Sequence, residues 1–144
     1  MTFIYNENRA NTHKKVAIYV RTSAHNNAEI ALHEQTMRVR EYCKEKGLSV
    51  CDTVGVVGNR QQGFEALQKA IKHAQENGVE AVVMTTSNRL YAAPNELELV
   101  LKALDESGVE LETMDGSHDA AKNSVTLHFI MNAGLDLESE DENE

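Results

Sequence analysis

The stretch Val16-Ala17-Ile18-Tyr19-Val20, which is followed at once by Arg21-Thr22-Ser23, decides the fold of this chain. A short apolar run that is rich in β-branched and aromatic residues is typical of a buried strand. The polar residues Ser23–Asn27 then predict a turn, in which Asn26 or Asn27 can cap the start of a helix. The sequence therefore opens with a buried strand that leads through a short turn into a helix.

The same order of strand and then helix repeats along the rest of the chain. Apolar residues at helical spacing, with Gly, Pro and Asn at the ends, predict helices that run to about Lys46, from Gly63 to Asn77-Gly78, and from Pro94 to Gly108. Further strands are expected at Leu48–Val57, Ala81–Thr85 and Val109–Met114, with loops at Gly58–Gln62 and Asp115–Asn123. This alternation predicts an α/β fold of three layers, α/β/α, around a mostly parallel sheet of four to five strands.

Each expected helix has an apolar stripe that would face the sheet. The stripes consist of Leu32, Val39 and Cys43, then Phe64, Leu67, Ile71 and Ala74, then Leu97, Leu101 and Leu104. The two cysteines, Cys43 and Cys51, have neither the spacing of a zinc site nor the number for a disulfide framework. We expect both to be buried, reduced thiols.

The chain has 144 residues, which is enough for one domain with a hydrophobic core. Its formal net charge of -9 has the wrong sign for a protein that binds nucleic acid unaided by neutralising phosphates. Six of these charges lie in Asp136–Glu144, which we interpret as a solvated tail or, alternatively, as a charged interaction arm. No apolar run is long enough for a membrane span, and the polar leader at residues 1–14 lacks the apolar centre of a secretory signal. We therefore expect a cytoplasmic protein.

The last apolar segment, from Ser124 to about Leu137, is expected to be a helix with Ser124 as its cap. Its apolar residues occupy nearly all sides of that helix and include Val125, Phe129, Ile130 and Met131. A helix that is apolar all round must be buried, and too little chain follows to cover it. We expect a partner subunit to cover it, so that the protein is an oligomer.

Candidate chemistry is expected beyond the carboxyl ends of the strands, where parallel α/β sheets bind their ligands. Arg21 and Ser23 alternate at the end of the first strand, so both side chains leave it on the same side. An arginine beside a hydroxyl suits phosphate chemistry, although a turn-forming serine and a surface arginine remain the alternative. No Gly-rich phosphate motif occurs, so no nucleotide cofactor is expected. Asp115, His118 and Asp119 share one loop, but such clusters arise by chance, and no metal site is expected.

Two further residues are candidates for the same edge of the sheet. Gln35 comes three residues after Leu32 and four before Val39, so it shares the inward side of the first helix. A buried amide must find partners, and the end of the first strand is within reach. The alternative is an amide at the edge of the stripe that faces water. Arg89 follows the third strand and either directs a second guanidinium at this edge or lies on a surface loop.

The order and spacing of these residues resemble the catalytic domain of the serine recombinases, the resolvase and invertase group. The resemblance covers roughly Lys15–Leu137 and rests on Tyr19-Val20-Arg21-Thr22-Ser23, Gln35, Arg38-Val39-Arg40-Glu41-Tyr42, and Val82-Val83-Met84 leading to Asn88-Arg89-Leu90. It implies that Ser23 attacks a DNA phosphodiester, forms a 5′-phosphoserine link and frees a 3′-hydroxyl. It also implies that Arg21 and Arg89 bind the scissile phosphate and that Gln35 lies beside the nucleophile. In that family the last long helix makes the dimer and contacts DNA.

Some positions depart from the family pattern. The usual Asp-Arg-Leu-x-Arg reads Asn88-Arg89-Leu90-Tyr91-Ala92 here. The amide of Asn88 cannot transfer a proton as a carboxyl group can, and Ala92 removes a positive charge from the phosphate site. Each lost donor typically lowers a rate by about 100- to 1000-fold. The arginine expected just before the second helix is uncertain, because Gln61 takes its place and Arg60 lies one residue away.

Two functions remain open at this point. The first is a recombinase domain, at residues 15–137, that cleaves and exchanges DNA strands and serves the integration of a mobile element. The second is a catalytically inactive, recombinase-like partner or regulator that pairs with a full-length recombinase through the last helix. Because acidic residues stand where a basic stretch and a DNA-binding domain are expected, DNA would be reached only weakly or through a partner.

Overall fold

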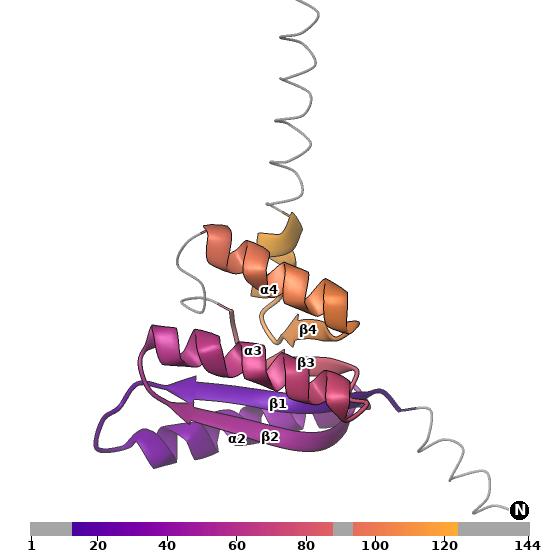
Figure 1. The fold of residues 1–144 in the computed structure, drawn as a ribbon. Helices are drawn as coiled ribbons and strands as arrows, with labels where there is room; N and C mark the ends of the chain where they lie inside the picture. Colours follow the sequence, from indigo (N-terminus) through magenta and orange to yellow (C-terminus); the bar gives the residue numbers. More distant parts are fainter. Residues whose placement is uncertain (1–12, 88–93, 124–144) are drawn as a thin grey trace, which may run out of the picture.

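A computed structural model describes residues 13–87 and 94–123 of the chain (Figure 1). The elements in chain order are β1 (Lys15–Thr22), α2 (Ala28–Glu45), β2 (Ser49–Val57), α3 (Arg60–Glu76), β3 (Ala81–Met84), α4 (Pro94–Ser107) and β4 (Glu110–Thr113). Residues 117–123 are also helical. The predicted repetition of strand and helix is confirmed.

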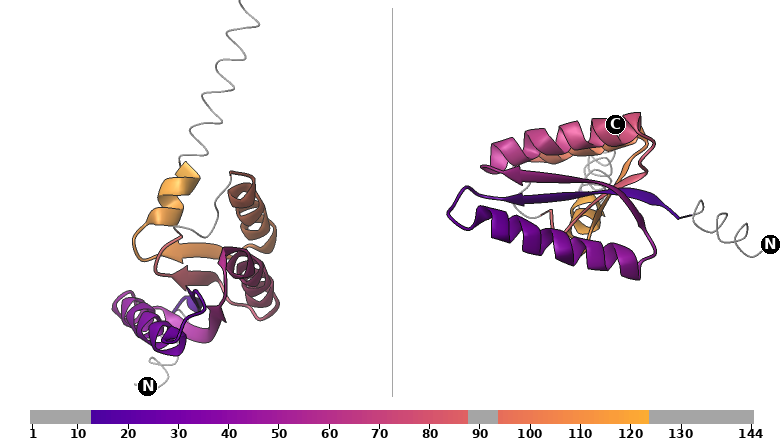
Figure 2. Two further views of the ribbon diagram at one scale, coloured as in Figure 1. Left: turned by 90° about the vertical axis from the view of Figure 1, so that its left-hand side faces the viewer. Right: turned by 90° about the horizontal axis from the view of Figure 1, so that it is seen from below.

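The four strands form one sheet in the order β2-β1-β3-β4, and every neighbouring pair is parallel. Helix α2 covers one face of the sheet, and α3 and α4 cover the other (Figure 2). The predicted three-layer α/β/α fold and its parallel sheet are therefore confirmed. Parallel strands require such crossovers, because consecutive strands must start at the same end of the sheet.

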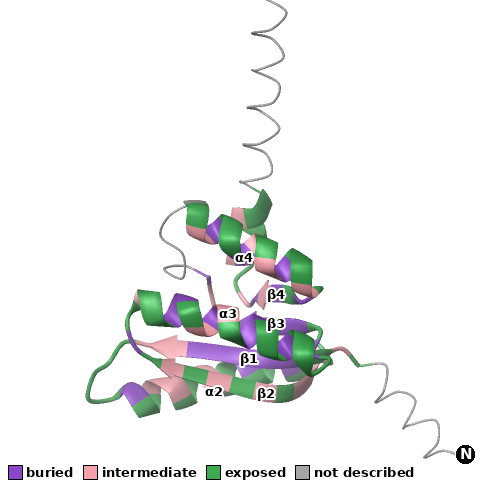
Figure 3. Cartoon of the chain, viewed as in Figure 1, coloured by how far each residue is buried: buried purple, intermediate pink, exposed green. Residues whose placement is uncertain are grey.

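The core lies on both faces of β1, whose residues 16–20 are all buried (Figure 3). Ala17 and Tyr19 face α3 and α4, whereas Val16, Ile18 and Val20 face α2. The helical stripes supply the other side of each cluster. Their fully buried members include Leu67 and Val39, together with Val100, which the predicted stripes do not contain.

Two predicted loops are wrong because helices begin inside them. Helix α3 begins at Arg60 rather than after Gln62, because Asn59 and Gln62 form a capping box: the Gln62 backbone N–H donates to Asn59 Oδ1, and the Asn59 N–H donates to Gln62 Oε1. The expected loop Asp115–Asn123 is helical from residue 117. Its first turn is stabilised by the Ser117 N–H, which donates to Asp115 Oδ1.

The prediction of two buried cysteines holds for Cys43 and is wrong for Cys51, which is exposed. The reason is the position of β2 at the edge of the sheet. Cys51 also lies where the register between β1 and β2 shifts, since Val16 faces Val50 and Ala17 faces Asp52. Such a bulge residue has no partner on the neighbouring strand.

Several expectations fall on residues 1–12, 88–93 and 124–144 and so lie outside the described residues. They concern the leader, Asn88, Arg89 and Ala92, the last helix with its proposed interface, and the acidic tail. Within the described ranges, no helix combines the length and apolar character that crossing a membrane requires.

Candidate active site

The order of the strands creates a switch point between β1 and β3. The chain leaves β1 toward α2 on one face and leaves β3 toward α4 on the opposite face. The connections therefore diverge beyond the carboxyl ends of these two neighbouring strands, which is where α/β sheets of this kind bind ligands. Arg21 lies at the end of β1, Ser23 follows the strand, and Gln35 lies on α2.

Gln35 is bonded to the backbone at the end of β1. The Arg21 N–H donates to Gln35 Oε1 at 3.0 Å, and Gln35 Nε2 donates to the Arg21 carbonyl at 3.1 Å. The amide therefore satisfies both main-chain groups of Arg21. The structure thus places Gln35 on the inward side of α2, as the helical spacing predicts, and not facing water.

The Arg21 side chain runs from β1 across the first turn of α3. Its Nε donates to the Asn59 carbonyl at 3.3 Å, and a Cβ at Gly63 would lie 2.6 Å from the same Nε. The Tyr19 hydroxyl donates to the Gly63 carbonyl at 2.6 Å. Burial raises the pKa of Tyr19 to about 12, so its hydroxyl stays a neutral donor. Gly63 is therefore the residue that lets Arg21 pass close to α3.

Ser23 follows β1 directly and is exposed. Near it lies His25, which is not among the residues predicted from the sequence. Its Nδ1 accepts the Asn27 backbone N–H at 3.1 Å, and its Nε2 lies 3.3 Å from Thr22 Oγ1. Because Nδ1 is an acceptor, the neutral ring carries its proton on Nε2. No sequence pattern distinguishes this histidine from any other polar residue in a turn.

Arg60 and Gln61, the two candidates for the family's arginine at this point, lie in the first turn of α3 and are bonded to residues outside the site. Arg60 Nη1 donates to both carboxylate oxygens of Glu96, each at 2.9 Å, and so joins α3 to α4. Gln61 is exposed and donates to Glu65 Oε1 at 3.3 Å. Among the described residues, the structure therefore bonds Gln35 to Arg21, with Ser23 two residues further along the chain, whereas Arg60 and Gln61 are bonded to Glu96 and Glu65.

Hydroxyl groups fix the chain where it leaves β3. The buried Ser87 donates its N–H to Ser117 Oγ at 2.8 Å and its own Oγ to the same atom at 3.0 Å. Thr86 Oγ1 lies 3.2 Å from Ser117 Oγ. Hydrogen bonds from Ser117 and Thr86 lower the pKa of Asp115 from 3.8 to about 2. This network fixes Ser87, the last described residue after β3.

A second guanidinium group among the described residues lies at the same edge of the sheet, on Arg38. Arg38 lines a cavity of about 470 Å³ together with Thr85, Met114 and Asp115, at the carboxyl ends of β3 and β4. It follows Gln35 by three residues, so the helical period could have identified it.

The expected chance cluster of Asp115, His118 and Asp119 is not arranged as a metal site. In the ranges that the structure describes, no three or more His, Cys, Asp or Glu side chains converge on one point. His118 is buried, and its burial lowers the pKa of the imidazole. Asp115 instead accepts the Ser117 N–H.

Comparisons with known proteins agree with this fold. The family model described as "Resolvase, N terminal domain" matches residues 16–143. The N-terminal catalytic domain of TP901-1 integrase is 27% identical, with a TM-score of 0.58, over 88% of this chain and 98% of that one. A resolvase family site-specific recombinase from Streptococcus pneumoniae is 17% identical, with a TM-score of 0.59, over 91% and 99%. The C-terminal catalytic domain of ISC1926 TnpA, an IS607-like serine recombinase, is 21% identical, with a TM-score of 0.56, over 78% and 79%. No curated protein matched the chain.

Replacing Gly63 with alanine should displace Arg21. The added Cβ would lie 2.6 Å from Arg21 Nε and 3.2 Å from the Tyr19 hydroxyl, so we expect a loss of about 1–3 kcal/mol in the free energy of unfolding, measured with denaturant. Gly55→Ala is the matched control, because its Cβ would meet Leu32 Cδ1 at an ordinary 3.7 Å. A Gly63→Ala variant of unchanged stability with an unshifted Arg21 Nε–H resonance would contradict the close approach.

The hydroxyl network predicts how stability depends on pH. Because the folded pKa of Asp115 lies at about 2, below its ordinary value of 3.8, its contribution to stability is present above about pH 4 and is lost as the pH falls to about 2. Free energies of unfolding measured across that window should change less steeply with pH in Asp115→Asn, and also in Ser117→Ala. A slope in both variants equal to that of the parent chain would show that the network does not hold this carboxylate.

Proposed function

Since the chain belongs to the resolvase N-terminal domain family, the serine recombinases, we propose that it is a catalytic core that cleaves and exchanges DNA strands through Ser23. Its 27% identity to the catalytic domain of TP901-1 integrase supports this assignment. Its relatives include an integrase and an IS607-like recombinase. DNA integration by a mobile element is therefore the context that we propose.

The observation that carries this proposal is the pair of hydrogen bonds between the Gln35 amide and the end of β1. The two bonds between the Gln35 amide and the Arg21 backbone fix the strand two residues before Ser23. Ser23 itself is exposed beyond the strand, at the switch point. A nucleophile on a fixed backbone, open to a large substrate, is what attack on a duplex requires.

The proposed reaction conserves the number of phosphodiester bonds. Ser23 Oγ loses its proton and attacks the phosphorus, the bond from phosphorus to the 3′ oxygen breaks, and that oxygen takes up a proton. The product is a 5′-phosphoserine and a free 3′-hydroxyl. A 3′-hydroxyl from another strand then reverses the step, so no energy cofactor is needed. The guanidinium groups of Arg21 and Arg89 would neutralise the charge on the phosphate oxygens.

We further propose that this core is slow. Asn88 stands where the family has an acid, and Ala92 where it has an arginine. Each change removes a group that would act on the phosphate, and each such loss costs about 100- to 1000-fold in rate.

These replacements also favour a second candidate, a partner that regulates a full-length recombinase by association. The net charge of -9 opposes direct DNA binding. In this case the chain would join a homo-oligomer or hetero-oligomer through its last helix and touch DNA weakly or through its partner.

The first candidate predicts a covalent adduct. The protein, alone and mixed with a full-length recombinase, is incubated with supercoiled DNA that carries the recombinase's site, and denaturing gels are used to detect labelled protein on DNA. We expect an adduct that Ser23→Ala abolishes. Ser49→Ala, at the opposite end of the sheet, should retain it. The absence of any adduct, together with a stable complex between the two proteins, would favour the second candidate instead.

The weakened site predicts a gain of activity. The double change Asn88→Asp and Ala92→Arg restores both family residues, so we expect the yield of adduct at a fixed time to rise by at least about tenfold. Asn88→Asp with Ala92→Gln restores the acid without the charge and should recover less. Equal yields from the parent and the double variant would show that these two positions do not limit the rate.

A further inference from the structure

Strand β4 has an open edge. It lies at the end of the strand order and pairs only with β3 among the described residues. The Glu110 N–H donates to the Glu80 carbonyl, and the Met114 N–H to the Met84 carbonyl. Because main-chain groups alternate in direction along a parallel strand, the N–H groups of Leu111 and Thr113 point away from β3. The carbonyls of Val109 and Leu111 point the same way.

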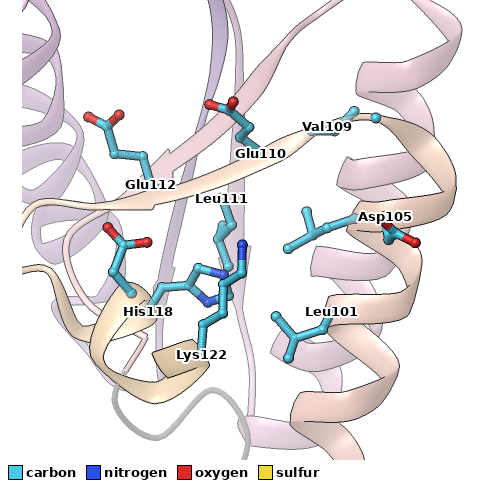
Figure 4. Close-up of a pocket in the computed structure, with 11 residues that line it drawn as sticks. Leu101, Asp105, Val109, Glu110, Leu111, Glu112, His118 and Lys122 are labelled. Atoms are coloured by element: carbon cyan, nitrogen blue, oxygen red, sulfur yellow. The ribbon is translucent and has the colours of Figure 1, made fainter. Parts of the chain in front are cut away.

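This edge forms the floor of a groove. The groove has a volume of about 600 Å³ and lies between α4 and the helix at residues 117–123 (Figure 4). These two helices stand on opposite faces of the sheet on either side of β4 (Figure 2). The lining of the groove includes Leu101 and Leu104 from α4 and Leu111 from β4. A segment that lies in the groove would therefore be covered on both faces, as an inner strand is.

The charge around the groove determines what can occupy it. Asp105, Glu110, Glu112 and Asp119 line it, and Lys122 is the one lysine or arginine in its described lining. Glu110 is paired with Lys14, so Asp105, Glu112 and Asp119 supply the remaining negative charge. The acidic rim would repel the phosphates of DNA, and it would repel the same rim on a second copy. It attracts a basic partner instead. The side chains along β4 alternate, with Leu111 packed on the α3 and α4 side and Glu112 bonded to Tyr42 of α2 on the other.

We propose that the open edge of β4 binds an extended, basic segment of another protein, which adds to the sheet as a fifth strand. The outward N–H and C=O groups of β4 supply the main-chain bonds, as in other cases of strand addition. Alternate side chains of the segment meet the leucines and Asp105 on the α4 face and Glu112 and Asp119 on the other. The partner is thus a polypeptide in which basic and apolar residues alternate.

The test uses the full chain and the peptide Lys-Val-Lys-Val-Lys-Val-Lys. Hydrogen exchange of the Leu111 and Thr113 N–H groups is followed by NMR, and we expect it to slow about tenfold when the peptide is at about ten times its Kd. Two further peptides carry N-methyl groups either on all valines or on all lysines. Only one of these two sets of amides can face β4, so one methylated peptide should lose binding and the other should keep it.

Two double variants distinguish the effect of the acids that line the groove from the effect of the protein's overall negative charge. Asp105→Asn with Asp119→Asn should weaken peptide binding by at least about threefold, whereas Glu41→Gln with Glu45→Gln, on the exposed side of α2, should not. Three results would overturn the proposal: no slowing at either amide, equal binding of both methylated peptides, or amides that are already protected in the free chain. Exchange of the β1 amides shows in every case that the fold is intact, and neither result depends on the activity of Ser23.

Discussion

One side-chain amide takes the place of a missing length of strand, and the site depends on it. Strand β1 extends to Thr22, but its pairing with β3 ends at Ile18. On the other side β2 accompanies β1 to its end, where the Gly58 N–H donates to the Thr22 carbonyl. The alternation of the strand turns the main-chain groups of Arg21 toward the side that β3 has left, and Gln35 bonds both of them. Buried main-chain groups without partners are costly, so the short β3 and Gln35 require each other.

In the described part of the chain, the same shortness leaves the last residues of β1 without a neighbouring strand on the β3 side. Main-chain bonding continues past β3 to the Thr85 carbonyl, which accepts the Asp115 N–H, and hydroxyl groups position Thr86 and Ser87 beyond it. Ser87 is bonded to Ser117, the first residue of the helix after β4, and Thr86 lies beside the same oxygen. On the opposite side of β1, Arg21 is held against the first turn of α3 by Asn59. The end of β1 is thus held by the Gln35 amide through its main chain and by the Asn59 carbonyl through the Arg21 side chain.

The sequence predicts what depends on periodicity and misses what depends on three-dimensional neighbours. Burial of β1 and of Leu67 follows from β-branched runs and from the helical period, so both were predicted. The early start of α3 depends on one local capping box, which apolar periodicity does not report. The exposure of Cys51 depends on the strand order, and the pairing of Arg60 with Glu96 depends on how α3 and α4 cross. Gln35 was predictable because a polar residue inside an apolar stripe must have a partner.

The helix at residues 117–123 belongs to both regions of the molecule. Its first residue, Ser117, holds the chain at the end of β3, and the next turn contributes His118, Asp119 and Lys122 to the groove beside β4. The His118 N–H also donates to Thr113 Oγ1, which ties this helix to the open strand. A segment that adds to β4 must pack against this helix, and any shift of the helix moves the oxygen that fixes Ser87. The helix therefore contacts the chain after β3 through the Ser117 hydroxyl and the groove through other residues, so Ser117→Ala, which leaves the lining of the groove unchanged, tests whether the two regions are coupled.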